Sequence, residues 1–117
     1  MPSPRRVASV RGAVHTPERI EFLYVDDCPS HPEALALLRG VLDERGISCA
    51  VELHEVRSDE EASALAFPGS PTIRIDGHDV DPAGAAGRPT LGCRIYRLPD
   101  GRFSPVPQRS QIEAALA

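Results

Sequence analysis

The chain contains no lysine and no tryptophan, and aromatic residues make up only 4% of its 117 residues. So few aromatic side chains argue against a surface on which nucleotide bases or sugars could stack. All 13 basic residues are arginines, they are spread along the chain, and the net charge is -4 at pH 7. A nucleic-acid-binding protein usually gathers its positive charge in one patch, so we expect no nucleic-acid partner.

Long hydrophobic runs are also missing. No stretch approaches the roughly 20 apolar residues that a membrane-spanning helix requires. The apolar run near the N-terminus is interrupted by Arg11, too early for the signal-peptide core of about 7 to 15 residues. We therefore expect no membrane association. Residues 1–18 are predicted to be a flexible tail in front of a single domain that covers residues 19–117.

Cysteine is scarce, with three residues at wide spacing, Cys28, Cys49 and Cys93. Secreted domains held together by disulfides carry a dense and even number of cysteines, which this chain does not. The composition, 41% hydrophobic and 26% charged, is typical of a folded globular protein. The cysteine content thus predicts a cytoplasmic protein. We expect a monomer or a weak homodimer, although the sequence does not determine the oligomeric state.

The first half of the domain alternates strands and helices. Residues 19–25 (RIEFLYV) are almost continuously apolar, as in a strand buried on both faces. Residues 34–45 place apolar side chains at three- and four-residue intervals, which predicts a helix. Residues 48–56 alternate as a strand does, with Cys49 in its core face. Residues 58–67 begin with a serine cap and acidic residues, which predicts a short helix.

The second half adds a hairpin and a closing helix. Residues 71–81 alternate as a strand and contain Asp76-Gly77, a strong turn signal. Residues 81–92 are rich in glycine and proline and are predicted to form a loop. Residues 93–98 are interpreted as the fourth strand and residues 108–117 as the last helix. The order strand, helix, strand, helix, strand, strand, helix predicts an α/β fold with a mixed four-stranded sheet flanked by helices.

Two short motifs give this pattern a family resemblance. CPSH (28–31) follows the first strand, and SPT (70–72) enters the third strand about forty residues later. This arrangement resembles the thioredoxin and glutaredoxin superfamily, and within it a small bacterial thioredoxin-like group with CPSH in place of C-x-x-C. The resemblance implies a thioredoxin-like fold over residues 19–117. It also implies that Pro71 is cis and lies beside the reactive cysteine. Ser70, Pro71 and Thr72 are the candidate substrate-binding residues, because Ser70 and Thr72 could offer backbone or hydroxyl contacts to a bound substrate.

Cys28 is the candidate nucleophile because of its surroundings. Ser30 and Glu33 fit the capping box S-x-x-E, which would place Cys28 just ahead of the unpaired amides of a helix. Those amides and a protonated His31 favour a thiolate. Asp26 and Asp27 precede the cysteine, and their negative charges oppose it. The sequence leaves the net effect open.

The second cysteine of C-x-x-C is replaced by His31, so the usual disulfide within the motif cannot form. Cys28 could act as a single thiol on a thiol or disulfide substrate, with His31 stabilising the thiolate or moving protons. Alternatively, Cys93 could be the resolving thiol, because it follows the glycine-rich loop. Both hypotheses describe a thiol-based redox protein that needs no cofactor.

Two other hypotheses involve no redox chemistry. Cys28, His31 and Cys93 could together bind a soft metal ion such as zinc, copper(I) or mercury, since thiolate and imidazole select such ions. The domain could also be a degenerate thioredoxin fold that serves only as a protein-binding module. His54 and His78 lie on a strand face and in the hairpin, and we expect both at the surface.

Overall fold

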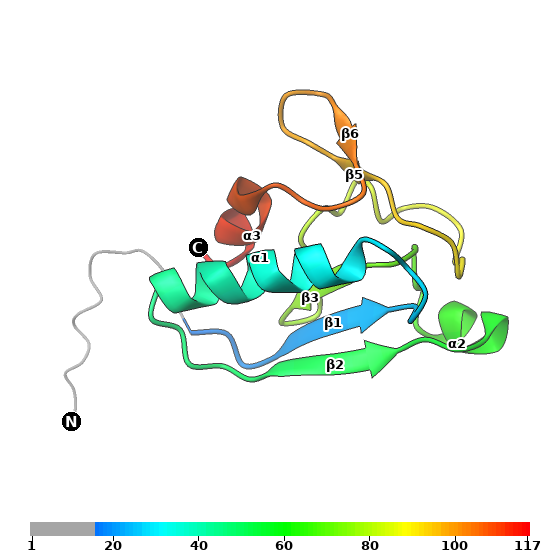
Figure 1. The fold of residues 1–117 in the computed structure, drawn as a ribbon, viewed down its shortest axis with the longest axis horizontal. Coiled ribbons are helices and arrows are strands. Elements are labelled where there is room, and N and C mark those ends of the chain that lie inside the picture. Colours follow the sequence, from blue (N-terminus) through cyan, green and yellow to red (C-terminus); the bar gives the residue numbers. More distant parts are fainter. Residues whose placement is uncertain (1–15) are drawn as a thin grey trace.

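The computed structural model describes residues 16–117, so the first 15 residues of the predicted tail lie outside the described part. Its main sheet has the strand order β2-β1-β3-β4 (Figure 1). The strands are β1 (Ile20–Tyr24), β2 (Val51–Glu55), β3 (Thr72–Ile75) and β4 (His78–Asp79). β1 pairs in parallel with β2 and antiparallel with β3, and β3 pairs antiparallel with β4. The predicted mixed four-stranded sheet is confirmed.

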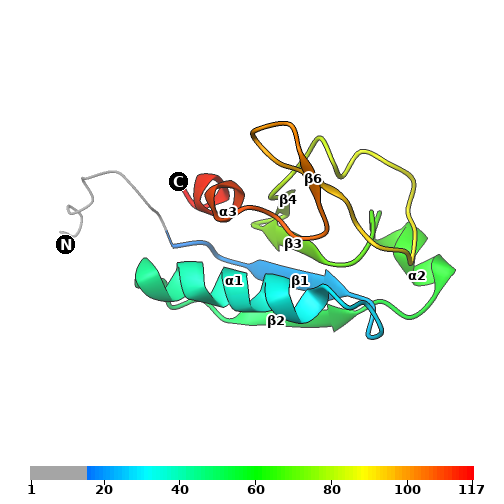
Figure 2. The same cartoon turned by 45° about the horizontal axis from the view of Figure 1, so that its top comes forward.

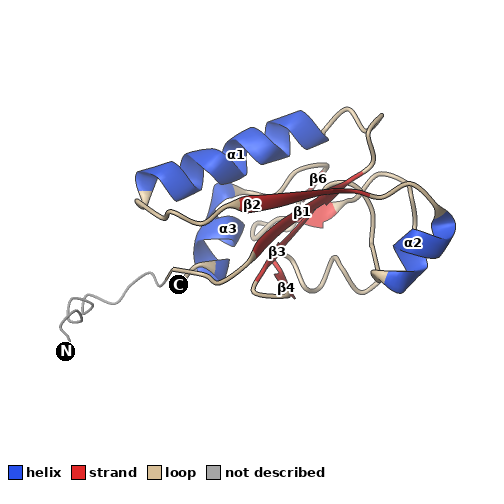
Figure 3. Ribbon diagram, turned by 90° about the horizontal axis from the view of Figure 1, so that it is seen from below, coloured by secondary structure: helices blue, strands red, loops and turns tan. Residues whose placement is uncertain are grey.

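Three helices accompany the sheet within residues 16–117. Helix α1 (His31–Glu44) runs along one face, and α3 (Arg109–Ala115) packs against it (Figures 1 and 3). Helix α2 (Asp59–Ala64) lies beyond the carboxyl ends of β1 and β2, where the chain also turns from β1 into α1. None of the helices within residues 16–117 is long and apolar enough to cross a membrane.

Strand β1 is buried on both of its faces, as its apolar sequence predicts. Phe22 belongs to the larger core cluster, which joins the sheet to α1 and α3. Leu23 belongs to a smaller cluster with Val56, Ala62 and Phe67 at the α2 end of the sheet. Since successive side chains of a strand point to opposite faces, β1 connects the two clusters.

The prediction for the fourth strand is wrong in its position. The fourth strand of the sheet is β4, which follows the Asp76-Gly77 turn directly. Residues 93–98 instead contribute β5 (Tyr96–Arg97), which pairs with β6 (Phe103–Ser104) in a separate hairpin (Figures 1 and 2). The reason is the two-residue turn. It brings β4 onto the free side of β3, so both sides of β3 are paired before the chain reaches Cys93.

The predicted capping box at the start of α1 is also absent. Ser30 is the N-cap, but its backbone is near-helical (φ -95°, ψ -11°) and its side chain makes no cap hydrogen bond. By contrast, the cap of α2, Ser58, is extended (φ -148°, ψ 159°) and accepts a hydrogen bond from the Glu61 amide. An extended N-cap is the conformation that places the hydroxyl over the free amides.

The second strand is shorter than predicted. It begins at Val51, so Cys49 precedes β2 instead of lying within it. Cys49 is half-buried and packs against the larger core cluster, and its thiol faces the Ala50 carbonyl at 3.7 Å. Leu53, in the middle of β2, is 51% exposed. Cys49 is thus a packing residue, as predicted, but not a residue of the strand.

Candidate functional site

Ser70 lies between the end of β1 and the CPSH motif. Its side chain is buried, and its hydroxyl accepts a hydrogen bond of 2.9 Å from the amide of Val25. The chain turns after Val25, where the Cys28 amide donates to the Val25 carbonyl at 3.0 Å. This turn directs the Cys28 thiol to the Ser70 carbonyl, with the sulfur 3.5 Å from the oxygen. Cys28 is only 7% exposed.

Cys93 lies on the other side of Ser70. The two residues form an isolated parallel bridge, in which the Ser70 amide donates to the Gly92 carbonyl and the Arg94 amide donates to the Ser70 carbonyl, both at 2.9 Å. One carbonyl oxygen therefore accepts hydrogen bonds from the Cys28 thiol and from the residue that follows Cys93. Cys93 itself is exposed, and both cysteines are free thiols. The structure brings Cys28, Ser70 and Cys93 together.

His31 occupies the first turn of α1 but faces other partners. Its Nε2 lies 3.2 Å from the Asp26 carbonyl, and its ring packs on Tyr24 with the centroids 4.7 Å apart. A carbonyl can only accept, so Nε2 carries a proton in this arrangement. A role of His31 in stabilising the Cys28 thiolate stays a prediction. The opposing carboxylates, Asp26 and Asp27, are exposed to solvent.

The SPT motif makes its polar contacts within the protein. The Ser70–Pro71 peptide bond is cis. The Thr72 hydroxyl is buried, donates to the Gly69 carbonyl at 2.7 Å and accepts from Arg94. The Pro71 carbonyl accepts a hydrogen bond of 2.7 Å from the Tyr96 hydroxyl. Substrate contacts by Ser70, Pro71 and Thr72 stay a prediction, and the side-chain hydroxyls already have partners in the fold.

The segment behind this motif contains a buried arginine that the sequence did not single out. Arg94 is 1% exposed, and its guanidinium forms a two-pronged ion pair with Asp79, both contacts at 2.8 Å. It also donates to the Asp81 carbonyl and the Thr72 hydroxyl. Its carbon Cζ lies 4.2 Å from the ring centre of Tyr96. Of its side-chain nitrogens, Nε is buried with no hydrogen-bond partner.

Burial and charge act on this cluster together. Burial lowers the pKa of Arg94, but the hydrogen bond and charge of Asp79, together with Tyr96, outweigh it and the net pKa is raised. The hydroxyl of Tyr96 has a raised pKa, chiefly because the residue is buried, and the positive charge of Arg94 offsets only part of that effect. The guanidinium is therefore charged and the phenol neutral at neutral pH.

The sequence held a partial signal for Arg94. In residues 93–97, Arg94 and Tyr96 are buried while Cys93, Ile95 and Arg97 are exposed. The period of two is present, but the apolar Ile95 is 60% exposed and the charged Arg94 points inward. Hydrophobicity alone selects the wrong face. Only the position of Asp79, fifteen residues earlier, explains why the arginine is inside.

The metal hypothesis finds no assembled site in the part of the chain that the structure describes. Within residues 16–117, no three histidine, cysteine or acidic side chains lie together in a way that could hold a metal ion. Cys28, His31 and Cys93 are therefore not gathered into one ligand set there.

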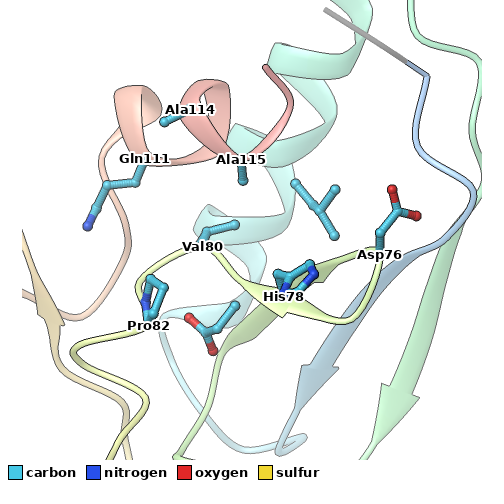
Figure 4. Close-up of a pocket in the computed structure, with 9 residues that line it drawn as sticks. Asp76, His78, Val80, Pro82, Gln111, Ala114 and Ala115 are labelled. Carbon is cyan, nitrogen blue, oxygen red and sulfur yellow. The ribbon is translucent and has the colours of Figure 1, made fainter.

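A hollow of about 590 Å³ lies elsewhere, between the β3–β4 hairpin and α3 (Figure 4). Asp76, His78 and Val80 line one side of it, and Gln111 and Ala115 line the other. None of the site residues predicted from the sequence lines this hollow. His78 is exposed at its rim, and His54 is exposed beside Glu61, so both histidines are surface residues as predicted.

No protein-family model, curated protein or solved structure matches the chain.

Proposed function

We propose that the chain is a thiol-based redox protein that acts through Cys28, with Cys93 as its resolving thiol. The observation that carries the proposal is the Ser70 carbonyl, which accepts from the Cys28 thiol and from the amide of Arg94, next to Cys93. Two segments that are far apart in sequence, each carrying one of the thiols, therefore meet at one residue. A disulfide between them requires Cα atoms within about 7 Å, which neighbours of a common residue can reach.

The chemistry is thiol-disulfide exchange. The Cys28 thiolate attacks one sulfur of a substrate disulfide, the substrate S–S bond breaks, and the departing thiolate takes up a proton. The Cys93 thiolate then attacks the Cys28 sulfur, which releases the second substrate thiol and leaves a Cys28–Cys93 disulfide. The substrate has gained two electrons, and the protein has lost them. An external thiol reductant of the glutathione type restores both cysteines.

The fold is consistent with this function. We propose that the mixed sheet is a thioredoxin-like one, because the CPSH motif lies between the central strand β1 and the helix α1, and the SPT motif leads into β3. Both motifs then lie at the same end of β1. The proposed chemistry requires a compartment that keeps thiols reduced, in agreement with the cytoplasmic location expected from the cysteine content.

Brief mild oxidation followed by mass mapping of the cysteines tests the proposal. We expect a Cys28–Cys93 disulfide in the wild type that reduced glutathione reverses. Cys49→Ser is the matched control, because Cys49 is half-buried away from Ser70 and its loss should leave this disulfide unchanged. Cys28→Ser and Cys93→Ser should each abolish it and lower the rate of disulfide reduction.

The same variants separate the competing hypotheses. A single-thiol mechanism predicts that Cys93→Ser keeps full activity and accumulates a mixed disulfide on Cys28. Zinc, copper(I) or mercury that binds stoichiometrically and protects Cys28 from alkylation would favour the metal hypothesis. If Cys28 stays reduced under all of these conditions and binds no metal, the redox proposal is wrong.

A further inference from the structure

Arg94 is buried in a way that stability alone does not explain. Its side chain is 0% exposed and pairs with an Asp79 side chain that is 9% exposed. Removing two charges from water is costly, and a buried ion pair is often no more stabilising than apolar side chains of the same size. What such a pair supplies is a fixed geometry, because the flat guanidinium accepts only one arrangement of its two-pronged partner.

The geometry that Arg94 fixes is that of residues 70–72. Its amide donates to the Ser70 carbonyl at 2.9 Å, and its guanidinium donates to the Thr72 hydroxyl at 3.2 Å. The ring of Tyr96 lies against the guanidinium, and its hydroxyl donates a hydrogen bond to the Pro71 carbonyl. Three consecutive residues of the SPT motif are thus attached to one short segment of chain.

The backbones of the two segments are also in close contact. Gly69 has a φ of +124°, and a Cβ atom placed on it would lie 3.0 Å from both the Cα and the amide nitrogen of Arg94. A side chain at this position would push the segments apart. Gly69 therefore permits the close approach of the Arg94 backbone, and the ion pair with Asp79 fixes the Arg94 side chain.

The residue that precedes Arg94 is Cys93. The Ser70 carbonyl, which accepts a hydrogen bond from the Arg94 amide, also accepts one from the Cys28 thiol. We infer that Arg94, anchored by Asp79, is a positioning residue that keeps Cys93 within reach of Cys28. This inference rests on the proposed function and specifies how the resolving step is set. Without the anchor, only the two backbone hydrogen bonds of the Ser70–Cys93 bridge would hold Cys93, at the end of a glycine- and proline-rich loop.

The test measures how readily the Cys28–Cys93 disulfide forms. Wild type, Arg94→Met, Arg94→Lys and Asp79→Asn are equilibrated with mixtures of reduced and oxidised glutathione, and the disulfide is quantified by mass. Arg94→Met has a similar length but no charge, whereas Arg94→Lys keeps the charge and loses the two-pronged contact. We expect the equilibrium constant to fall about a hundredfold in Arg94→Met and Asp79→Asn, because a disulfide that closes away from its preferred geometry is strained and more easily reduced. In Arg94→Lys the equilibrium constant should fall less, because the charge is kept.

Two controls keep this result specific. Arg97→Met removes an exposed arginine from the same hairpin, where it lies over Phe103, and should leave the constant unchanged. Circular dichroism selects the variants that are folded, and Asp79→Asn, which preserves size, serves if Arg94→Met does not fold. The single-thiol adduct of Cys28 with glutathione should form equally in all of them, because it does not involve Cys93.

The outcomes distinguish this inference from the proposed function. A wild type that never forms the Cys28–Cys93 disulfide overturns both. A wild type that forms it, with folded Arg94→Met or Asp79→Asn variants that form it equally well, overturns the role of Arg94 and leaves the proposed function standing. A selective loss in the Arg94 and Asp79 variants, partly recovered by lysine, supports the inference.

Discussion

At the scale of single residues, glycine provides the sharpest contrast in the chain. Gly69 has a positive φ and packs against the backbone of Arg94, whereas Gly40 lies in α1 with no heavy atom within 4 Å of the place where a Cβ would be. The same substitution should therefore have opposite effects at the two positions.

We predict that Gly69→Ala lowers the free energy of unfolding by about 1 to 3 kcal/mol, because a side chain at this φ is strained and the Arg94 backbone must also move. Gly40→Ala should raise the free energy by about 0.5 to 1 kcal/mol, since alanine is the better helix former and meets no neighbour. Urea unfolding followed by circular dichroism measures both. Equal effects of the two substitutions would contradict the close contact at Gly69.

Tyr96 should make the stability depend on pH in the alkaline range. Its pKa is raised in the folded protein from an ordinary value of 10.0, so above pH 10 the unfolded chain loses this proton while the folded protein keeps it. The unfolded state then binds fewer protons, and the free energy of unfolding falls as pH rises, by at most about 1.4 kcal/mol per pH unit for one group. Below pH 10 the contribution is fully present.

Tyr96→Phe should remove this alkaline slope, and Tyr24→Phe should retain it because that substitution leaves Tyr96 in place. Unfolding curves recorded between pH 8 and 11 provide the comparison. The same substitution also removes the hydrogen bond to the Pro71 carbonyl, so Tyr96→Phe should lower stability at neutral pH by about 1 kcal/mol. An unchanged slope in Tyr96→Phe would show that other groups cause it.

At the scale of the elements, the two predicted helix N-caps differ in outcome. Ser58 and Ser30 both precede helices, but only the Ser58 hydroxyl accepts an amide hydrogen bond. Ser58→Ala should therefore cost about 1 kcal/mol of stability, the usual value of a lost cap. Ser30→Ala should cost a few tenths at most. Thermal unfolding of the two variants side by side measures the difference, and equal losses would argue for a capping bond at Ser30.

The elements show which parts of the fold the sequence could predict. Helix periodicity in residues 34–45 and the Asp76-Gly77 turn are local signals, and both led to the observed elements. The fourth strand failed because its assignment depends on which edge of β3 is still free when the chain returns, and local alternation contains no such information. The capping box failed because the backbone of Ser30 is near-helical and not extended, and the S-x-x-E pattern contains no information on that angle.

The candidate site was predictable to a similar extent. The CPSH and SPT motifs and Cys93 are visible in the sequence, and the structure gathers Cys28, Ser70 and Cys93 around one carbonyl. Arg94 was not predicted, because its burial depends on Asp79 in the preceding hairpin. A charged side chain is placed inside by its partner, and pairs that are distant in sequence have no periodic pattern.

At the scale of the whole molecule, the fold is held by two core clusters on opposite faces of one sheet. The larger joins the sheet to α1 and α3, and the smaller joins it to α2 near Ser70. Leu38 is fully buried in the larger cluster, whereas Leu53 is 51% exposed on the edge strand β2. Substitution of Leu38 therefore tests the packing of the core, and substitution of Leu53 tests whether β2 is exposed.

Leu38→Ala should lower the free energy of unfolding by about 2 to 5 kcal/mol, through lost transfer energy and the cavity left behind. Leu53→Ala should change it by less than about 0.5 kcal/mol. Denaturant unfolding measures both, and a large effect at Leu53 would mean that another surface covers β2.

The carbonyl of Ser70 has one more consequence, which concerns spectroscopy. It accepts two hydrogen bonds at once, from the Cys28 thiol and from the Arg94 amide. When Cys28 is oxidised or alkylated, the thiol proton is gone and the carbonyl keeps the amide as its donor. The proton resonance of the Arg94 amide should therefore shift whenever Cys28 changes state, so a single backbone signal can follow the chemistry of a sulfur atom that is almost hidden from solvent.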